Sequence, residues 1–287
     1  MAVNGRETWA GPGRRNGHSA GPPGLRPGPA ERACVTGGVT GGPRAGDAFG
    51  EMLLAETETR QAGGGRSVTE IVERDDGFIS AASPSRYFAG PAAWASFERE
   101  ALDLVTGRVI DIGCGAGRFA LALQDRGAAV TALDISPGAV AVARRRGVRE
   151  VVLGSAPDGV AGRAAYDTFL LMGENLGLMG GRASAAAFLA GLAAAASPAA
   201  RIIGHGADPH ETDDPVHVRY RERNHAAGAM DGQMIIRVRH RDLATEWFPY
   251  LLCSPAELAG LAAGTPWELT SVEHADQVNY LAVLTRR

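Results

Sequence analysis

The sequence predicts an α/β protein with a mostly parallel sheet of seven strands and an antiparallel closing hairpin. Two observations lead to this prediction. Short runs rich in β-branched residues alternate with helical stretches between residues 108 and 204, and two adjacent strand patterns end the chain. Parallel neighbours need crossover connections, which helices of this length can supply.

The pattern of each segment gives the expected elements in order. The parallel strands are expected at Arg108–Ile112, Ala129–Asp134, Val151–Leu153, Asp167–Met172 and Arg201–Gly204. The helices between them are expected at Arg118–Asp125, Pro137–Arg145 and Ala183–Ala195, and a turn followed by a helix is expected over Ser85–Leu104. Ser254 as N-cap and Pro255 at the first helical position predict a helix to Gly264. The closing hairpin is expected at Trp267–Val272 and Gln277–Leu284.

Two regions lie outside this alternation. Residues 1–66 are dense in Gly, Pro, Arg and Ala and have almost no periodic apolar pattern. They cannot bury enough surface to offset the entropy of ordering, so we expect a disordered tail before a domain at 67–287. Residues 208–249 are polar and are expected to form a lid-like insertion, with Val216–Arg221 and Met234–Arg239 as a strand pair.

Composition excludes several classes of function. All 29 basic residues are arginine, so neither a P-loop lysine nor a pyridoxal-phosphate Schiff base is available. The cysteines Cys34, Cys114 and Cys253 have the spacing of neither a disulfide framework nor a zinc site. A net charge of −3 and the lack of a long apolar stretch predict neither a nucleic-acid partner nor a membrane partner. We expect a cytoplasmic protein.

A glycine-rich loop carries the strongest chemical signal. The stretch V-I-D-I-G-C-G-A-G, from Val109 to Gly117, joins a strand to a helix. Its glycines let the backbone approach a ligand closely, and the helix N-terminus offers unpaired N–H groups. The next strand ends in Asp134, whose carboxylate can accept hydrogen bonds from both ribose hydroxyls of an adenosine. This pattern predicts a cofactor that contains adenosine.

Two details separate the loop from a nicotinamide-dinucleotide site. The pattern G-x-G-x-x-G would need a glycine where Arg118 stands. Asp111 at the loop entrance would repel a pyrophosphate but could orient a cationic amino group.

With these motifs the sequence resembles the class I methyltransferases that depend on S-adenosylmethionine (SAM), whose first motif is close to E/D-x-G-x-G-x-G. The resemblance extends from about Tyr87 to Arg287 and implies a Rossmann-like three-layer sandwich with SAM as cofactor. The cofactor-binding residues that it implies are Tyr87, Asp111, Gly113, Cys114, Gly115, Gly117, Asp134, Ile135, Ser155, Ala156, Met172 and Gly173.

The resemblance also implies roles. The three glycines would pass under the methionine and ribose parts of SAM, Asp111 would support the amino group, Asp134 would hold the ribose and Ile135 would pack on the adenine. Ser155 stands where the family often has an acid, so the adenine amino contact is in doubt. Residues 172–175, M-G-E-N, should line the methyl-transfer face. They depart from the N/D-P-P-Y pattern of many enzymes that methylate amino groups of DNA and protein.

The acceptor side is expected after the later strands. His205 follows the fifth strand and is our candidate for a general base, with Glu174 as the second catalytic candidate. The substrate-binding candidates are Asn175, Tyr220, Asn224, Arg239 and Trp247, and Tyr87 and Trp94 could close the opposite side. The acidic and His-rich residues from 205 to 217 are expected to form a solvated loop, with no metal bound.

The predicted function is methyl transfer from SAM to an oxygen or nitrogen of a small-molecule acceptor. Methyl transfer from a sulfonium needs alignment and exclusion of water, so a general base is optional. Three alternatives stay open: a SAM-binding regulatory module without catalysis, an NAD-dependent oxidoreductase, and a SAM enzyme that transfers another carbon of SAM.

Overall fold

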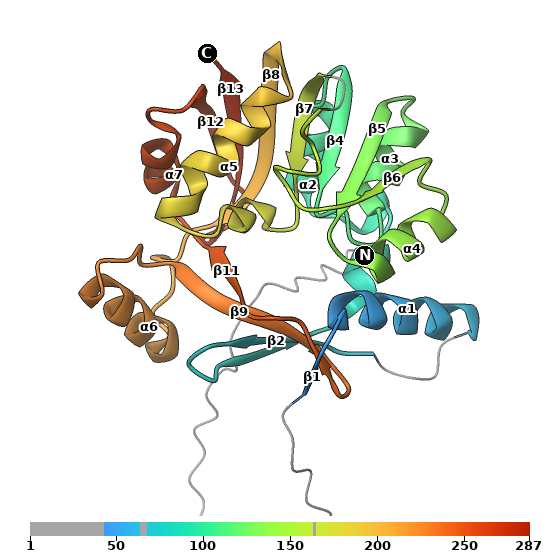
Figure 1. Cartoon of the computed structure of the whole chain (residues 1–287), viewed down its shortest axis with the longest axis horizontal. Helices are drawn as coiled ribbons and strands as arrows, with labels where there is room; N and C mark the ends of the chain where they lie inside the picture. Colours follow the sequence, from blue (N-terminus) through green and yellow to red (C-terminus); the bar gives the residue numbers. More distant parts are fainter. Residues whose placement is uncertain (1–42, 64–67, 163–164) are drawn as a thin grey trace, which may run out of the picture. The chain divides into compact units, whose positions relative to one another are not determined.

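A seven-stranded sheet forms the centre of the computed structural model, which describes residues 43–63, 68–162 and 165–287. Its strand order is β12-β13-β8-β7-β4-β5-β6 (Figure 1). The five parallel strands are β4 (Arg108–Ile112), β5 (Ala129–Asp134), β6 (Glu150–Leu153), β7 (Tyr166–Leu171) and β8 (Ala196–Ala207). The strands β12 (Trp267–His274) and β13 (Asn279–Arg286) form the antiparallel hairpin, with β13 next to β8. The predicted sheet and hairpin are therefore confirmed.

Helices cover both faces of this sheet. One hydrophobic cluster joins the sheet to α5 (Arg182–Ala194) and α7 (Pro255–Ala262), and a second joins it to α2 (Ser96–Asp103), α3 (Arg118–Asp125) and α4 (Pro137–Arg145). Along β4, Ile110 belongs to the first cluster and Val109 to the second. Both faces of a parallel strand are buried in such a sandwich, which explains the continuous apolar runs of the sequence.

A second sheet lies beside the loops that follow β4 and β7 (Figure 1). It contains β1 (Arg44–Ala45), β2 (Glu70–Arg74), β3 (Ile79–Ala82), β9 (Gln233–His240), β10 (Leu243–Ala244) and β11 (Phe248–Leu251). We call it the cap sheet. Its central strands β2 and β9 pair antiparallel, so segments more than 150 residues apart build one layer.

The predicted start of the folded domain is wrong, because residues 48–61 form the helix α1 (Ala48–Gln61). The side chain of Asp47 caps this helix, and Met52 and Leu53 are fully buried in a cluster with Ala139 and Val142 of α4. The tail predicted for residues 1–42 lies outside the described residues.

The predicted strand at Val216–Arg221 is also wrong. These residues belong to the helix α6 (Pro215–Ala226), which Asp214 caps and Pro215 opens. Met234–Arg239 does lie in a strand, but its partners are β2, β10 and β11. The alternation of arginines with apolar residues suggested a strand in the first segment. The helix-capping residues Asp214 and Pro215, which precede it, were the signal for a helix.

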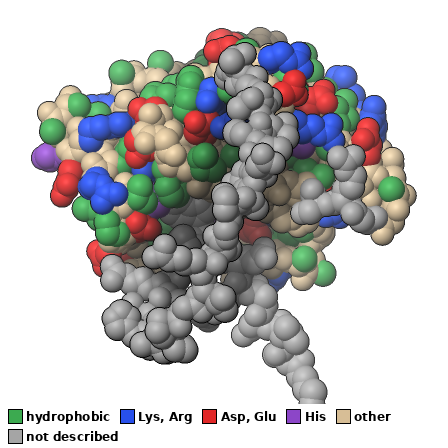
Figure 2. All heavy atoms as spheres, turned by 90° about the horizontal axis from the view of Figure 1, so that it is seen from below, with side chains coloured by type: hydrophobic (Ala, Val, Ile, Leu, Met, Phe, Trp, Pro, Cys, Tyr) green, Lys and Arg blue, Asp and Glu red, His purple; other side chains and the backbone are tan. Residues whose placement is uncertain are grey.

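Three short 3₁₀ helices complete the described elements: η1 (Pro84–Phe88), η2 (Pro91–Ala93) and η3 (Asn175–Met179). No helix in the described part of the chain is long and apolar enough to cross a membrane. Arginines and acidic residues are interspersed with apolar side chains on the face seen in Figure 2.

Candidate functional site

The glycine loop is held against the end of β5. Gly113, Gly115 and Gly117 have φ of 71°, 54° and 76°, a left-handed conformation that glycine adopts without steric cost. The N–H groups of Gly113 and Cys114 donate to the carbonyl of Leu133 at 2.8 and 3.1 Å. The loop then enters α3, for which Gly117 is the N-cap. The backbone is thereby shaped to pass closely beneath a ligand.

Asp134 ties the loop to β5. One oxygen of its carboxylate accepts from the N–H of Gly115 at 2.8 Å and the other accepts from the N–H of Ser136 at 2.9 Å. The residue is buried, which raises the pKa of its carboxyl to about 6. Each carboxylate oxygen has a second lone pair, so the group can still accept hydrogen bonds from a ligand.

Asp111 has a buried carboxylate oxygen, Oδ2, with no hydrogen-bond partner among the described residues. Burial raises the pKa of this carboxyl to about 7, against the opposing effect of the nearby Arg118 charge. An unsatisfied buried acceptor is costly, and a cationic or donating ligand group would satisfy it. This oxygen fits the amino group of an amino-acid cofactor.

Two aromatic rings stand over the loop. A Cβ placed on Gly115 would lie 3.6 Å from the ring of Tyr87 and 3.7 Å from that of Phe49, and the two rings pack edge to face with centroids 5.4 Å apart. Sequence reasoning found Tyr87 but missed Phe49, because it lies in the expected tail. The signal was present: Asp47 as a cap, followed by Phe49, Met52 and Leu53 at helical spacing.

Asp47 links α1 to the start of α4. Its Oδ2 accepts from the hydroxyl of Ser136 at 2.9 Å and from the N–H of Gly138 at 2.8 Å, and its Oδ1 accepts from the N–H of Gly50 at 2.9 Å. Gly138 and Gly50 lie so close that a Cβ on Gly138 would be 2.6 Å from the Cα of Gly50. The helix α1, which lies in the segment predicted to be a tail, therefore forms one wall of the site.

An apolar surface flanks Asp134. Ile135 is 71% exposed and Leu153 is 55% exposed, and Leu153 pairs in register with Asp134. Exposed apolar side chains at two adjacent strand ends suit a flat ring such as adenine. Ser155 is exposed and its carbonyl accepts from the N–H of Gly159, while Ala156 packs against the core.

Two residues of the M-G-E-N segment differ from their predicted roles. Met172 is only 3% exposed and its side chain packs in the core, so it does not line the methyl-transfer face. Asn175 donates from Nδ2 to the carbonyls of Ile112 and Gly113 at 2.9 and 3.0 Å. It thus supports the glycine loop instead of facing an acceptor. Gly173 is exposed with φ of 75°.

His205 is not free to act as the predicted base. Its Nδ1 accepts from the N–H of Glu174 at 3.0 Å, so the ring hydrogen is on Nε2, 3.0 Å from the Oδ1 of Asn279. The amide of Asn279 donates in turn to Asp276, which fixes its orientation. Both ring nitrogens are engaged within the protein, and the residue is buried.

Tyr220 and Asn224, which were predicted to bind the substrate, both have side chains buried in contacts of α6. The Tyr220 hydroxyl donates to Asp75 at 2.7 Å, and the Asn224 amide donates to the carbonyls of Asp231 and Gln233 at 3.0 and 2.6 Å. The sequence pattern had placed Tyr220 in a strand, whereas both residues lie on the helix α6 with their side chains packed against the protein.

Arg239 and Trp247 also lie away from the site. Cross-strand partners point to the same face of a sheet and successive residues to opposite faces. Arg239 pairs with Ile71, whereas Val238 pairs with Val72 on the face of Glu70, the residue that contacts Tyr87. Arg239 instead lies 3.4 Å from Glu73 on the outer face, and the guanidinium of Arg237 stacks on Trp247 with 4.4 Å to the ring centroid.

The inner face of the cap sheet contributes residues that the sequence did not indicate. Glu70 accepts from the hydroxyl of Tyr87 at 2.6 Å and pairs with Arg86 at 2.5 Å. From β11, the hydroxyl of Tyr250 donates to the carbonyl of Glu174 at 2.6 Å. These contacts join the cap sheet to the loop after β7. No local sequence signal could find them, since they depend on pairing between distant segments.

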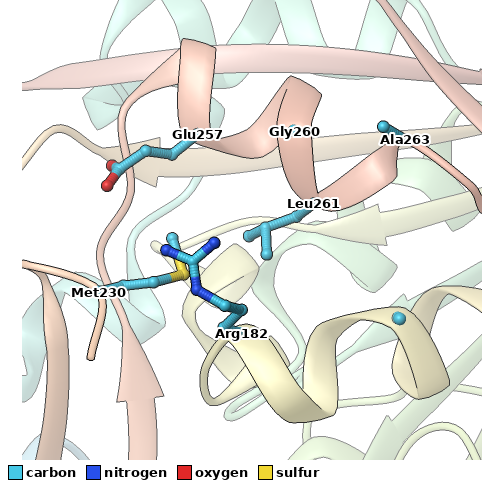
Figure 3. A pocket seen from close by; sticks show the side chains of 7 residues that line it. Arg182, Met230, Glu257, Gly260, Leu261 and Ala263 are labelled. Carbon is cyan, nitrogen blue, oxygen red and sulfur yellow. The ribbon is translucent and has the colours of Figure 1, made fainter. Parts of the chain in front are cut away.

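A separate hollow of about 320 Å³ lies at α5 and α7 (Figure 3). Arg182 and Met230 approach each other there, and Glu257 lines the same hollow. The carboxylate of Glu257 already accepts from the N–H and the hydroxyl of Ser254, the N-cap of α7. The described residues hold no cluster of three or more His, Cys, Asp or Glu side chains arranged for a metal ion.

Comparisons of sequence relate this site to methyltransferases. The model of a methyltransferase domain family matches residues 109–198, which include the glycine loop, Asp134 and Glu174. A ubiquinone biosynthesis O-methyltransferase of Xanthomonas oryzae pv. oryzae is 45% identical over 51 residues, or 18% of this chain. The match spans 21% of that protein, about a fifth of its length.

Comparisons of structure extend the similarity beyond the parallel sheet. A SAM-dependent methyltransferase from Bacteroides fragilis, solved with S-adenosyl-L-homocysteine, has a TM-score of 0.70 and 25% identity, covering 84% of this chain and 94% of that one. Because 84% of this chain is aligned, the similarity must include residues before Arg108, where the parallel sheet begins. A SAM-dependent methyltransferase from Methanosarcina mazei has a TM-score of 0.50 at 16% identity, covering 64% of this chain and 95% of that one, and shows the shared fold.

Proposed function

We propose that this chain, which belongs to the class I SAM-dependent methyltransferases and uses SAM as its cofactor, transfers the methyl group of SAM to an oxygen or nitrogen of a small molecule. The observation that carries the proposal is the bond between Asp134 and Gly115 beneath the rings of Phe49 and Tyr87. It brings together a glycine loop that a ligand can approach closely, a carboxylate with free lone pairs, and two aromatic rings over the loop, which we call the aromatic roof.

The residues divide into groups that would hold different parts of the cofactor. Asp134 would accept from the ribose hydroxyls, and Ile135 with Leu153 would pack on the adenine. Asp111 would stabilise the cationic amino group, since its buried oxygen has no partner among the described residues. Gly113, Gly115 and Gly117 would let the backbone pass under the ligand, with Tyr87 and Phe49 above it.

SAM supplies an activated methyl group on a sulfonium whose departure leaves neutral S-adenosylhomocysteine. The protein therefore mainly has to align the acceptor with the methyl group and exclude water. The cap sheet can align the acceptor and exclude water, because its inner face lies against the loops after β4 and β7. Glu70 of the sheet binds Tyr87, whose ring lies over the loop after β4, and Tyr250 of the sheet binds the loop after β7. Glu174, at the end of β7, would accept the acceptor's proton.

The contacts of the cap sheet also support the proposal that the acceptor is a small molecule. It contacts the loop after β7 through the Tyr250 hydroxyl and supports the aromatic roof through Glu70. Oxygen as the methylated atom is supported by the name of the Xanthomonas relative, an O-methyltransferase. The described cysteines Cys114 and Cys253 are free thiols, which agrees with the cytoplasmic location we propose.

Calorimetric titration of the full chain with S-adenosylhomocysteine, SAM and NAD tests the cofactor site. We expect S-adenosylhomocysteine and SAM to bind and NAD not to bind. Binding of NAD alone would refute the proposal. Incubation with methyl-labelled SAM and fractionated small-molecule extract then tests catalysis. Transfer of label to a product heavier by one CH₂ supports methyl transfer, and S-adenosylhomocysteine binding without any transfer would favour a regulatory module.

A further inference from the structure

Glu174 has a backbone conformation that is unusual for its residue type. Its φ and ψ are 65° and 15°, in the left-handed region, directly after Gly173 with φ of 75°. A residue with a Cβ pays a steric cost there, and such strain persists only where the surroundings enforce it. Glu174 is the N-cap of η3 in the loop after β7, next to Asn175, which holds the glycine loop.

Two side chains from other elements enforce this conformation. The N–H of Glu174 donates to Nδ1 of His205 on β8 at 3.0 Å, and its carbonyl accepts from the hydroxyl of Tyr250 on β11 at 2.6 Å. His205 is itself fixed through Asn279. Both backbone polar groups of this strained residue are thus bound by side chains of other elements, one of the parallel sheet and one of the cap sheet, and the carbonyl also accepts from the N–H of Gly177 at 2.9 Å.

The carboxylate of Glu174 has no partner in the part of the chain that the structure describes. Among the described residues it makes no hydrogen bond and no ion pair. The charge of Glu174 affects a neighbouring group. Burial lowers the pKa of Arg86, but electrostatic interactions with Tyr87, Glu70 and Glu174 outweigh it and raise this pKa. Burial and then the charge of Glu174 raise the pKa of Tyr250. Because the Tyr250 hydroxyl also binds the carbonyl of Glu174 at 2.6 Å, Glu174 lies in the region of Tyr250.

The charges of this region favour one class of acceptor. Glu70 neutralises Arg86 through an ion pair at 2.5 Å, whereas the carboxylate of Glu174 has no ion pair with any described residue. A carboxylate acceptor would be repelled by Glu174, whereas a hydroxyl or an ammonium group can donate a hydrogen bond to it.

We propose that His205 and Tyr250 are positioning residues that hold Glu174 in the left-handed conformation, so that its carboxylate receives the proton of a hydroxyl or ammonium acceptor. The inference rests on the proposed methyltransferase function. In the step, the acceptor oxygen or nitrogen bonds to the methyl carbon while the carbon–sulfur bond breaks and leaves its electron pair on sulfur. An ammonium acceptor gives its proton to Glu174 before the attack, because only then does its nitrogen have a lone pair, whereas a hydroxyl gives its proton as the bond to carbon forms; in both cases the proton passes from Glu174 to solvent.

Tyr250→Phe tests the positioning without any knowledge of the acceptor. Tyr280→Phe is the matched control, because the Tyr280 hydroxyl also donates to a backbone carbonyl, that of Cys253 at 2.7 Å. With S-adenosylhomocysteine bound, we expect Tyr250→Phe to speed amide exchange of residues 174–177 at least tenfold, and Tyr280→Phe to leave it unchanged. Equal exchange in wild type and Tyr250→Phe would overturn the positioning role.

A nitrogen-15 spectrum of the His205 ring gives a second structural readout. We expect a bare Nδ1 and a protonated Nε2 in wild type at neutral pH, since Nδ1 accepts from Glu174. A ring with the hydrogen on Nδ1 would contradict the bond to the Glu174 amide and with it the role of His205.

Glu174→Gly and Glu174→Gln separate the effect of the left-handed backbone conformation from the proton-accepting role of the carboxylate. Glycine relieves the left-handed strain, so we expect a higher Tm together with a loss of turnover of at least a hundredfold on the acceptor found with labelled SAM. Glutamine should lower kcat similarly with the KM for SAM changed less than threefold, and Tyr250→Phe should lower kcat less. A Glu174→Gln enzyme within twofold of wild-type kcat would refute the proton-accepting role.

These outcomes are distinct from failure of the proposed function. If wild type binds no S-adenosylhomocysteine, the methyltransferase proposal fails, and the exchange and nitrogen-15 measurements on the ligand-free chain still decide whether Tyr250 and His205 hold Glu174.

Discussion

The carboxylate of Asp134 accepts a hydrogen bond from the N–H of Gly115 at 2.8 Å across 19 residues of sequence. The acid proposed to hold the ribose therefore also shapes the loop that would pass beneath it. Because the second oxygen is bound by the N–H of Ser136, the carboxylate is oriented before a ligand arrives. A preorganised group loses less entropy on binding.

Replacement of this carboxylate should weaken the cofactor site. We expect Asp134→Ala to reduce affinity for S-adenosylhomocysteine by about 1.5–3 kcal/mol, since hydrogen bonds to a charged group are lost. Calorimetry checks this, with Asp103→Ala as control because Asp103 pairs with Arg126 only on the surface. Unchanged affinity in Asp134→Ala would remove Asp134 from the site.

The contact between α1 and α4 predicts opposite effects for two helical glycines. Gly138→Ala would place a Cβ 2.6 Å from the Cα of Gly50, so we expect a loss of about 1–3 kcal/mol in the free energy of unfolding. Gly260→Ala in α7 meets nothing within 4 Å and should stabilise by about 0.5–1 kcal/mol. Urea unfolding measures both, and a neutral Gly138→Ala would show that α1 shifts freely.

The pH dependence of stability should follow from the buried acids. Burial raises the pKa of Asp134 to about 6 and that of Asp111 to about 7, above the value of about 3.9 in an unfolded chain. The folded state therefore binds more protons between pH 4 and 7, and these groups make the ligand-free protein less stable as pH rises through that window.

Asp111→Asn should flatten this dependence. We expect the variant to gain at least about 1 kcal/mol over wild type in the free energy of unfolding at pH 8 relative to pH 4, because the amide carries no charge to bury. Urea unfolding at several pH values tests it, and an unchanged slope would mean that Asp111 keeps an ordinary pKa.

Asn224 should matter for stability and not for the acceptor. Its amide satisfies the carbonyls of Asp231 and Gln233, so we expect Asn224→Ala to cost about 1–3 kcal/mol in the free energy of unfolding. Glu222→Ala, at an exposed position of the same helix, should be nearly neutral. A raised KM for the acceptor with unchanged stability would restore the substrate role that the sequence suggested.

Much of the cofactor side could be predicted because its signals are local. The loop from Gly113 to Gly117 follows directly on a buried strand, and the distance to Asp134 is set by a single βα unit. Periodicity, capping residues and glycine positions are properties of short segments, and they specify the parallel core and the family. The same kind of signal, Asp47 followed by helical spacing, was present in α1 but was obscured by the glycine-rich and proline-rich residues before it.

The acceptor side could not be read from the sequence in the same way. Tyr250 reaches the carbonyl of Glu174, and Glu70 reaches Arg86 and Tyr87, from the two strands β11 and β2, which both join β9 in the cap sheet. The register of that sheet turns Arg239 outward, and the packing of α6 buries Tyr220 and Asn224. The sequence alone determined the parallel core, the glycine loop and the cofactor, since these depend on neighbours along the chain. The tertiary structure decided which side chains lie toward the proposed acceptor region, because the register of β2 against β9 joins residues more than 150 positions apart and α6 packs through contacts such as that of Tyr220 with Asp75.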